Sequence, residues 1–310
     1  MSSSLSFDGQ VAVVTGAGRG LGRAYAVELA RRGAAVVVND LSGEHARAVT
    51  GEIEAAGGSA LASEETVSTP AGAEAIAAAA LDRFGRIDAL VNNAGFMRNA
   101  YLEELAPEDF DAVLDVHLRG SFLVTRAAWP ALRRAKEGRV VMTCSAGGLF
   151  AMQAECNYAA AKAGVYGLAK ALSFEGREHG IRVNALLPMA GTRIESAQPV
   201  PDYERHYPEE VRAALAPLRH VRSVTPFVVY LASRACAVTG EAFSVGFGRF
   251  ARVFVGETPG WIAPEESDVL PEELAVRIDE IRALDGFAVP ADIYDEVRFI
   301  ASSLGLVEAR

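Results

Sequence analysis

Three side chains in the middle of the chain have the chemical types needed to move a proton on and off an oxygen atom. Tyr158 and Lys162 are four residues apart, so on a helix both side chains would face the same way. The chain has only three lysines and eight tyrosines, but the same spacing recurs at Tyr166 and Lys170, so the spacing alone does not single out Tyr158 and Lys162. Ser145 follows an apolar run at 139–143 that is typical of a buried strand. These three residues are candidates for one catalytic centre.

Such a centre needs an acid or base beside the reacting oxygen. A free phenol has a pKa of about 10 and is a poor base at neutral pH. A nearby Lys162 ammonium, together with the positive charge of an oxidised nicotinamide, would favour the phenolate form of Tyr158. The Ser145 hydroxyl would hold the same oxygen and stabilise the charge that develops on it. We therefore expect Tyr158 to exchange the proton of an alcohol or ketone while a cofactor exchanges the hydride.

A glycine-rich loop near the N-terminus predicts where that cofactor binds. The apolar run 11–14 leads into Thr15-Gly-Ala-Gly-Arg-Gly-Leu-Gly22, and a helical pattern begins as the loop ends. Glycines allow a tight turn and close backbone approach to a pyrophosphate, which then lies at the positive end of a helix dipole. A purely structural turn is the alternative, but the flanking strand and helix favour a dinucleotide. The expected contacts are Gly16, Arg19, Gly20, Leu21 and Gly22.

Asp40, at the end of the second predicted strand, bears on the choice between NAD and NADP. Its carboxylate would accept hydrogen bonds from the adenosine ribose hydroxyls and repel a 2′-phosphate, which favours NAD. Two alternatives stay open: Asp40 could cap the following helix, and Arg19 could bind a 2′-phosphate. Asn93, Ala94 and Gly95 follow another strand, at 89–91, and are expected to line the cofactor cleft rather than form a simple turn.

Apolar runs alternate with amphipathic helical patterns along most of the chain. The predicted strands are 11–14, 35–38, 89–91, 139–143, 181–187 and 241–245, and the predicted helices are 22–32, 45–56, 71–84, 107–134 and 158–177. This alternation indicates an α/β fold with a single Rossmann-like, doubly wound parallel sheet. The proline-rich segment 195–217 interrupts the rhythm and is a candidate substrate cover.

A second region follows the predicted Rossmann-like domain of residues 1–250. Residues 251–310 carry helical patterns at 272–284 and 291–304, and in the first of these Leu274, Ile278, Ile281 and Leu284 fall on one face. We expect this helical extension to pack on the core or on a neighbouring subunit.

Composition narrows the classes of partner. The net charge of −10 disfavours nucleic acid and anionic membrane surfaces. The sequence shows neither a leader peptide nor an apolar run long enough to span a membrane, and the three cysteines lack metal-ligand spacing. We expect a cytoplasmic enzyme with a small-molecule substrate and no metal.

The motifs at 15–22, 92–95, Ser145 and Tyr158-x-x-x-Lys162 resemble those of the short-chain dehydrogenase/reductase family from about residue 7 to 248. The resemblance implies a seven-stranded sheet, a Ser-Tyr-Lys centre and a homodimer or homotetramer. It also implies cofactor contacts from Thr66 and Val67, which stand where an acid-bearing motif is usual, and from Pro188 and Thr192.

A closer resemblance is to the dehydrogenase domain of multifunctional enzymes of type 2, carried by segments such as Val116-His-Leu-Arg-Gly-Ser-Phe and Thr125-Arg-Ala-Ala-Trp. It implies NAD-linked oxidation of a (3R)-hydroxyacyl-CoA or a 17β-hydroxysteroid. His117 stands where most of the family has an asparagine that supports a proton path, so His117 either serves that relay or is structural. A rival reading is an NAD(H)-binding sensor or scaffold that has lost its chemistry.

Overall fold

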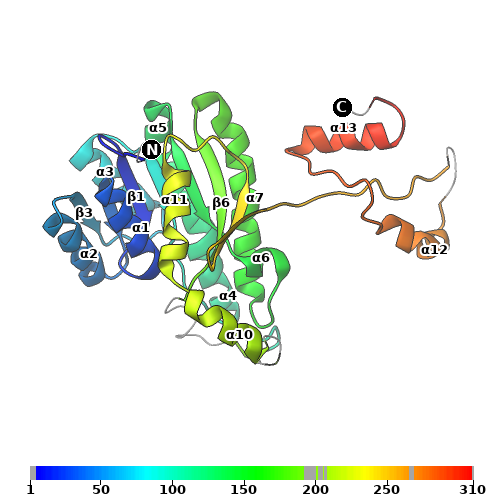
Figure 1. Ribbon diagram of the computed structural model, residues 1–310, viewed down its shortest axis with the longest axis horizontal. Helices are drawn as coiled ribbons and strands as arrows, with labels where there is room; N and C mark the ends of the chain where they lie inside the picture. Colours follow the sequence, from blue (N-terminus) through cyan, green and yellow to red (C-terminus); the bar gives the residue numbers. More distant parts are fainter. Residues whose placement is uncertain (1–4, 192–199, 202–204, 206–207, 265–268, 309–310) are drawn as a thin grey trace. The chain divides into compact units, whose positions relative to one another are not determined.

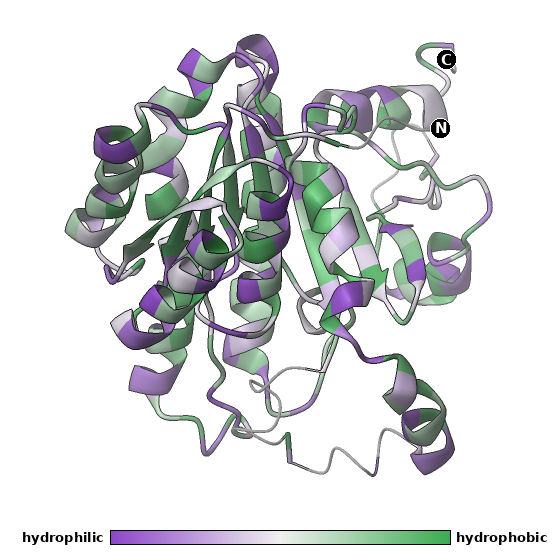
Figure 2. Cartoon of the chain, turned by 60° about the vertical axis from the view of Figure 1, so that its left-hand side comes forward, coloured by the Kyte–Doolittle hydropathy of each residue, from purple (hydrophilic) through white to green (hydrophobic). Residues whose placement is uncertain are grey.

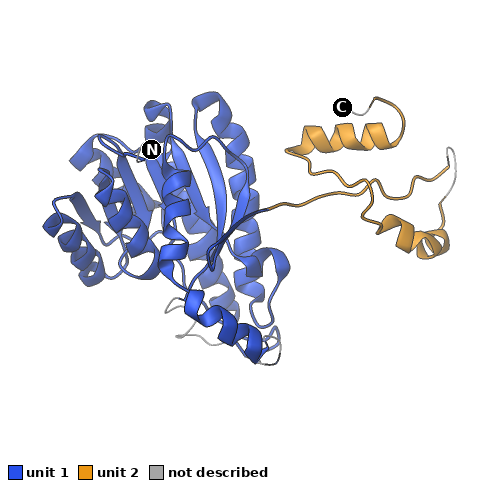
Figure 3. Cartoon of the chain, viewed as in Figure 1, with its two compact units in different colours: residues 1–252 blue, residues 253–310 orange. Residues whose placement is uncertain are grey.

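The computed structural model describes residues 5–191, 200–201, 205, 208–264 and 269–308. The chain divides into two compact units, residues 1–252 and 253–310 (Figure 3). Within the described residues, no helix combines the length and the apolar character that crossing a membrane would require.

The first unit is built on an eight-stranded sheet with the order β3-β2-β1-β4-β5-β6-β7-β8 (Figure 1). The strands are β1 Val11–Thr15, β2 Ala35–Asn39, β3 Ser59–Ser63, β4 Ala89–Asn92, β5 Arg139–Thr143, β6 Arg182–Met189, β7 Ala242–Gly246 and β8 Arg249–Val253. Pairing from β3 through β7 is parallel. The strand order reverses between β1 and β4, and ligands of such sheets bind in the crevice at the carboxyl ends of the strands flanking this point.

The strands form because their side chains are apolar on both faces. Every residue of β1, β4 and β5 is buried, which is the pattern of a parallel sheet covered by helices on both sides. In Figure 2 the strands at the centre of this unit are predominantly hydrophobic. The six strands expected from apolar runs are all present, and the structure adds β3 and β8.

Helices cover the sheet on both faces, which confirms the expected doubly wound α/β fold. The helices α1 Gly20–Arg31, α2 Gly43–Ala55 and α11 Thr225–Ala232 form one layer, in which α1 contacts the other two. The helices α3 Pro70–Phe84, α4 Pro107–Leu114, α5 Gly120–Ala135 and α7 Cys156–Gly176 belong to the other, with α3 against α5 and α4 against α7. Two short helices of this unit are α6 Ala146–Phe150 and α10 Glu209–Leu215.

The prediction of one continuous helix over 107–134 is wrong. A π-helical turn at Asp115–Arg119 separates α4 from α5, and the Gly120 N–H donates to the carbonyl of Asp115, five residues back. The Ser121 hydroxyl donates to the carbonyl of His117 at 2.6 Å, which satisfies an acceptor in the widened turn. Such π-turns interrupt α-helices most often at functional sites. This one carries His117.

The second unit contains α12 Pro271–Ile281 and α13 Ile293–Ser303. An antiparallel bridge joins Glu257 to Ala288, and the rings of Phe254 and Phe287 stack with their centroids 6.1 Å apart. None of the described residues of α12 or α13 is buried.

Candidate active site

The glycine loop between β1 and α1 folds tightly because side chains are absent where backbone segments meet. Gly16 has a φ of +61°, and a Cβ there would lie 2.7 Å from the Cα of Ala94. A Cβ on Gly22 would lie 2.2 Å from the Gly16 carbonyl oxygen. Gly20 also has a positive φ, +55°, but no atom lies within 4 Å of the position of its missing Cβ. The loop is therefore packed against β4 at Gly16 and open at Gly20.

The N-terminus of α1 has the properties of an anion site. Its N-cap, Arg19, makes no side-chain capping hydrogen bond, and its first turn carries no acid. By contrast, Ser42 and Thr69 cap α2 and α3 with their hydroxyls. The first N–H groups of a helix have no intrahelical acceptor, and the helix dipole favours negative charge beside them. The residues present thus fit a dinucleotide pyrophosphate at α1, as the sequence predicts.

Asp40 lies at the mouth of this loop. Its carboxylate accepts hydrogen bonds from the N–H of Gly18 at 2.9 Å and from the N–H of Ser42 at 3.0 Å. Gly18 is required here, because a Cβ would lie 2.7 Å from Oδ2 of Asp40. The carboxylate is partly exposed and fixed in position, so its remaining lone pairs are available to hydroxyl groups.

Asn93 fastens the end of β4 to the cofactor loop. Its amide nitrogen donates to the carbonyls of Thr15 at 3.0 Å and Gly16 at 3.1 Å. The Thr15 hydroxyl in turn accepts from the N–H groups of Asn93 and Ala94. Asn93 was expected to line the cofactor cleft; in the structure its side chain holds the glycine loop against the end of β4. Thr15 was not predicted as a site residue, because a threonine at the end of a strand carries no distinctive signal.

Ser145, Tyr158 and Lys162 come together where α6 contacts α7. Ser145 is the N-cap of α6, and its Oγ accepts from the Gly147 N–H at 3.1 Å. A Cβ on Gly147 would lie 3.6 Å from Ser145 Oγ and 3.9 Å from Cδ1 of the Tyr158 ring. Nζ of Lys162 lies 5.6 Å from the centroid of that ring. The predicted constellation is therefore assembled at the carboxyl end of β5.

Lys162 is buried, with 3% of its surface exposed. Its Nζ donates to the carbonyl of Thr143 at 2.6 Å, which holds the ammonium at the end of β5. Burial disfavours the charged form and lowers the pKa of Lys162 to about 8, while the nearby Cys144 raises it slightly. At neutral pH the group still carries its positive charge for most of the time. The charge is thus held beside Tyr158 in a poorly solvated position.

His117 is buried against the same tyrosine. Its ring meets the ring of Tyr158 edge to face, and its Nε2 lies 2.6 Å from the carbonyl oxygen of Phe96. Burial and, to a smaller extent, the charge of Lys162 hold the pKa of His117 well below its usual value, although the hydrogen bond with Phe96 opposes them. The Phe96 N–H also lies 3.1 Å from this nitrogen, so Nε2 donates to the Phe96 carbonyl in one neutral tautomer and accepts from the Phe96 N–H in the other. The buried Nδ1 has no hydrogen-bond partner among the described residues.

The remaining predicted residues lie around these groups. Thr66 is half-buried, and its hydroxyl is 2.9 Å from that of Ser68; Val67 is buried and faces Gly120. Pro188 lies near the end of β6, paired with Val245. Thr192 lies outside the described residues.

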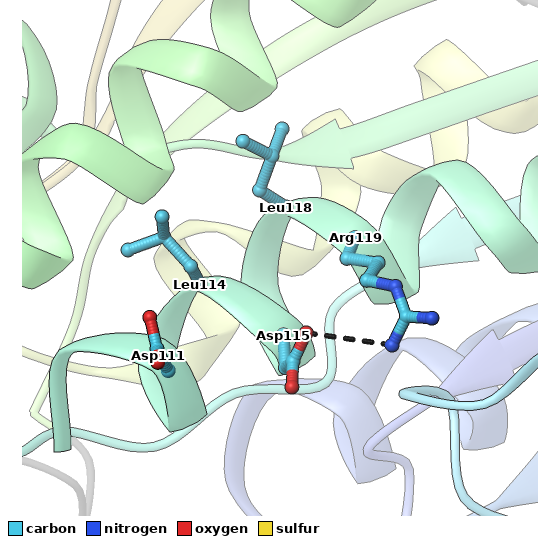
Figure 4. A pocket seen from close by; sticks show the side chains of 5 residues that line it. All are labelled: Asp111, Leu114, Asp115, Leu118 and Arg119. Carbon is cyan, nitrogen blue, oxygen red and sulfur yellow. Dashed lines mark hydrogen bonds and ion pairs between the residues drawn. The ribbon is translucent and has the colours of Figure 1, made fainter. Parts of the chain in front are cut away.

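A hollow of about 390 Å³ lies elsewhere, on the surface of α4 and the π-helical turn (Figure 4). Leu114 and Leu118 line it together with Asp111 and an ion pair between Asp115 and Arg119, 3.5 Å apart. None of the predicted catalytic or cofactor-binding residues contributes to it, so this hollow is not the active site.

Comparison with known proteins identifies the family to which the chain belongs. The family model described as short chain dehydrogenase matches residues 10–198, more than half of the chain. The chain belongs to the short chain dehydrogenase family. It is an oxidoreductase that acts on CH–OH groups and binds a nicotinamide cofactor.

Relatives of this short chain dehydrogenase fall into two kinds. The mouse peroxisomal multifunctional enzyme type 2 is 38% identical over the whole of the chain, which covers 41% of the mouse protein. A short-chain type dehydrogenase/reductase of Mycobacterium tuberculosis is 41% identical, over 89% of this chain and 95% of the relative. Among solved structures, a short chain dehydrogenase from Mycobacterium avium has a TM-score of 0.76 at 35% identity, covering 89% of this chain and 97% of that one. The chain thus spans less than half of the mouse enzyme but nearly all of the two mycobacterial proteins.

Proposed function

We propose that this short chain dehydrogenase interconverts a secondary alcohol and a ketone with NAD, using Ser145, Tyr158 and Lys162. The observation that carries the proposal is the buried ammonium of Lys162, held by the Thr143 carbonyl beside the ring of Tyr158. Its charge favours the phenolate, which takes the carbinol proton during oxidation and returns it during reduction. The Ser145 hydroxyl accepts from Gly147 and keeps its own proton to donate to the substrate oxygen. When bound, the nicotinamide would supply the hydride acceptor or donor.

The proposal of NAD rests on Asp40. The carboxylate is fixed by the N–H groups of Gly18 and Ser42, and it cannot turn away from a group placed at the mouth of the loop. Ribose hydroxyls would donate to it, whereas a 2′-phosphate would be repelled. Arg19 is the counter-argument, since its side chain is exposed at the start of α1 and could approach a phosphate. We give the fixed carboxylate more weight because its position is set by two hydrogen bonds.

We propose a (3R)-hydroxyacyl-CoA or a 17β-hydroxysteroid as the substrate. Support comes from the resemblance to the multifunctional enzymes and from the name of the mouse relative. Apolar side chains that are exposed at the end of β6 and in the segments that follow β4, β5 and β6 are also consistent with a large apolar substrate. They are Leu102, Phe150, Met152, Met189 and Leu218.

A spectrophotometric panel tests the proposal by following NADH formation with a (3R)-hydroxyacyl-CoA, a 17β-hydroxysteroid and simple secondary alcohols. Tyr158→Phe should lower turnover of any active substrate by about 10²–10⁴-fold and leave NADH binding measurable. Tyr166→Phe, the same change two turns further along α7, is the matched control and should stay active. A fully active Tyr158→Phe enzyme would overturn the mechanism.

The second candidate is a catalytically idle NAD(H)-binding sensor or scaffold. The short, well-formed glycine loop would serve such a protein equally well. The burial of Lys162 argues against it, because an idle protein gains nothing from desolvating an ammonium group. NADH binding without turnover of any substrate in the panel would favour this second candidate.

A further inference from the structure

The end of α5 forms one side of a second surface hollow, the arginine hollow. Its volume is about 340 Å³, and it is lined by Pro130, Arg133 and Arg134 of α5 and by His179 of the turn after α7. Both arginines are exposed. The helix α5 leads into the amino end of β5, whereas Ser145 follows the carboxyl end of that five-residue strand, about 16 Å further along. The arginine hollow is therefore separate from the catalytic centre.

Two tight turns bring the lining residues together. The helix α5 ends at its C-cap Lys136, which has a φ of +62°, and the turn after α7 ends at Gly180, which has a φ of +68°. A Cβ on Gly180 would lie 2.0 Å from the carbonyl oxygen of Lys136, so the two turns can approach this closely only because residue 180 is glycine. His179 is thereby held beside the last turn of α5, which carries Arg133 and Arg134.

The two arginines of the arginine hollow have no anionic partner in the part of the chain that the structure describes. Neither Arg133 nor Arg134 makes an ion pair or a side-chain hydrogen bond with the described residues. The nearest acid along the chain, Glu137, pairs instead with Arg234 at 3.2 Å. The dipole of α5 favours cations at its C-terminal end, which accounts for basic residues in its last turn. It does not account for two guanidinium groups that border one hollow without a counter-ion.

Two further arginines add positive charge at this end of the sheet. Arg139 begins β5, Arg182 begins β6, and the two residues are paired in register. Arg139 is buried and donates to the carbonyls of Ser233 at 2.9 Å and Gly138 at 3.0 Å, while Arg182 donates to the carbonyl of Cys236. Burial and, to a smaller extent, the charge of Arg182 lower the pKa of Arg139. Because both guanidinium groups bind carbonyls rather than carboxylates, they leave a positive local potential in a chain whose net charge is −10.

The size of the arginine hollow and the type of its cations favour a phosphate group as the ligand. A guanidinium group donates two parallel hydrogen bonds to two phosphate oxygens, and two such groups match a doubly charged anion. Pockets of about 300–1,000 Å³ are typical of sites for small molecules. We propose that Arg133 and Arg134 bind the phosphate or pyrophosphate group of a small molecule, at a site distinct from the cofactor and substrate sites. This inference does not depend on the proposed function.

Isothermal titration calorimetry with inorganic pyrophosphate tests the inference. The full chain is first saturated with NADH, so that the anion site at the start of α1 is occupied and the heat reports a second site. The wild type should bind pyrophosphate with a Kd of about 1 mM or tighter, and acetate at the same ionic strength at least about tenfold more weakly. A wild type that does not bind pyrophosphate, or that binds acetate equally well, would overturn the inference.

Variants of α5 make the result specific to the arginine hollow. The double variant Arg133→Gln, Arg134→Gln should weaken pyrophosphate binding about tenfold or more. Arg126→Gln, at an exposed position of the same helix outside the hollow, is the matched control and should leave the Kd unchanged. If the double Gln variant folds poorly, the double variant Arg133→Lys, Arg134→Lys keeps the charge but loses the planar fork, and should weaken binding about threefold or more. An unchanged Kd in the double variant, or the same loss in Arg126→Gln, would place the binding elsewhere and overturn the inference.

Discussion

The imidazole of His117 meets the phenol of Tyr158 edge to face, with ring centroids 5.2 Å apart and an interplanar angle of 90°. Gly95 makes this contact possible, because a Cβ there would lie 2.1 Å from Cε1 of His117. The π-helical turn carries the ring, and Phe96 fixes it through its carbonyl. We propose that His117 is a positioning residue for Tyr158 and that its ring takes the tautomer that donates from Nε2, which leaves Nδ1 as the acceptor of a hydrogen bond from a water molecule.

This proposal predicts that two variants of His117 differ in kcat. His117→Leu removes the polar ring and should lower kcat about tenfold or more, with little change in NADH affinity. His117→Asn restores a donor and an acceptor and should recover most of the loss. His179→Leu, in the exposed turn after α7, is the control. Full activity in His117→Leu would show that the ring only fills space.

The depressed pKa of His117 predicts the shape of the pH profile. Burial holds the pKa of His117 well below 6.5, so the ring is neutral at pH 6.5 and above. The profile of kcat/KM around pH 6.5 should therefore be the same in the wild type and in His117→Asn. If kcat/KM of the wild type falls below pH 6.5 and that fall is absent in His117→Asn, the ring is protonated in this range and the prediction is wrong.

Because the Lys162 ammonium is buried, the free energy of unfolding should depend on pH. Its pKa is about 8 in the folded protein and 10.5 in the unfolded chain, so the unfolded chain binds more protons between these values. The free energy of unfolding of the wild type should therefore rise with pH across this window, relative to Lys162→Met, by about 3 kcal/mol. Chemical denaturation of both proteins at pH 7 and pH 10 measures it. If the free energies of unfolding of the wild type and of Lys162→Met change by the same amount between pH 7 and pH 10, the Lys162 ammonium is solvated.

Asp40 predicts how cofactor choice can be changed. Asp40→Ser removes the charge that repels a 2′-phosphate but keeps a short side chain that can accept from the N–H of Ser42. The ratio of kcat/KM for NAD to that for NADP should fall by about tenfold or more. The wild type should prefer NAD, and a clear wild-type preference for NADP would assign the controlling role to Arg19 instead.

Much of the fold follows from local sequence, because buried parallel strands need continuous apolar runs. β1, β2, β5 and β6 show this plainly. β3, with the sequence Ser-Ala-Leu-Ala-Ser, does not; its small residues become a strand because β2 offers a parallel edge. β8 follows β7 after the two-residue turn Phe247–Gly248, where both φ values are positive. Phe247 is an uncommon residue for that conformation, so the turn could not be predicted.

The site was predictable in its chemistry but not in its surroundings. Tyr158 and Lys162 are recognisable only in company with Ser145 at the end of a predicted strand, because Tyr166 and Lys170 have the same spacing. The pKa of Lys162 depends on burial by distant segments, which spacing cannot show. The π-helical turn at His117 was also hidden, because its sequence continues the helical pattern and the close packing of the His117 ring against Gly95 joins residues from different elements.

The helical extension, residues 253–310, exposes apolar side chains that another surface could cover. Its helices are amphipathic, and their apolar side chains are exposed in this unit taken alone: Leu274, Val276 and Ile278 on α12, and Ile293, Val297 and Ile300 on α13. Fully burying such a side chain contributes about 1.5–3 kcal/mol. We propose that the extension packs on the core or on a neighbouring subunit of a homodimer or homotetramer.

Ile278→Asp tests this packing. If α12 is docked, a charge on its apolar face should lower Tm by several degrees or reduce the mass of the oligomer measured by light scattering. Asp279→Asn, at the neighbouring exposed position of α12, should change neither quantity. Hydrogen exchange adds an independent measure, because amides of a docked α12 exchange slowly and amides of an isolated 11-residue helix do not. An Ile278→Asp protein with unchanged Tm, mass and exchange would show that the extension is not docked.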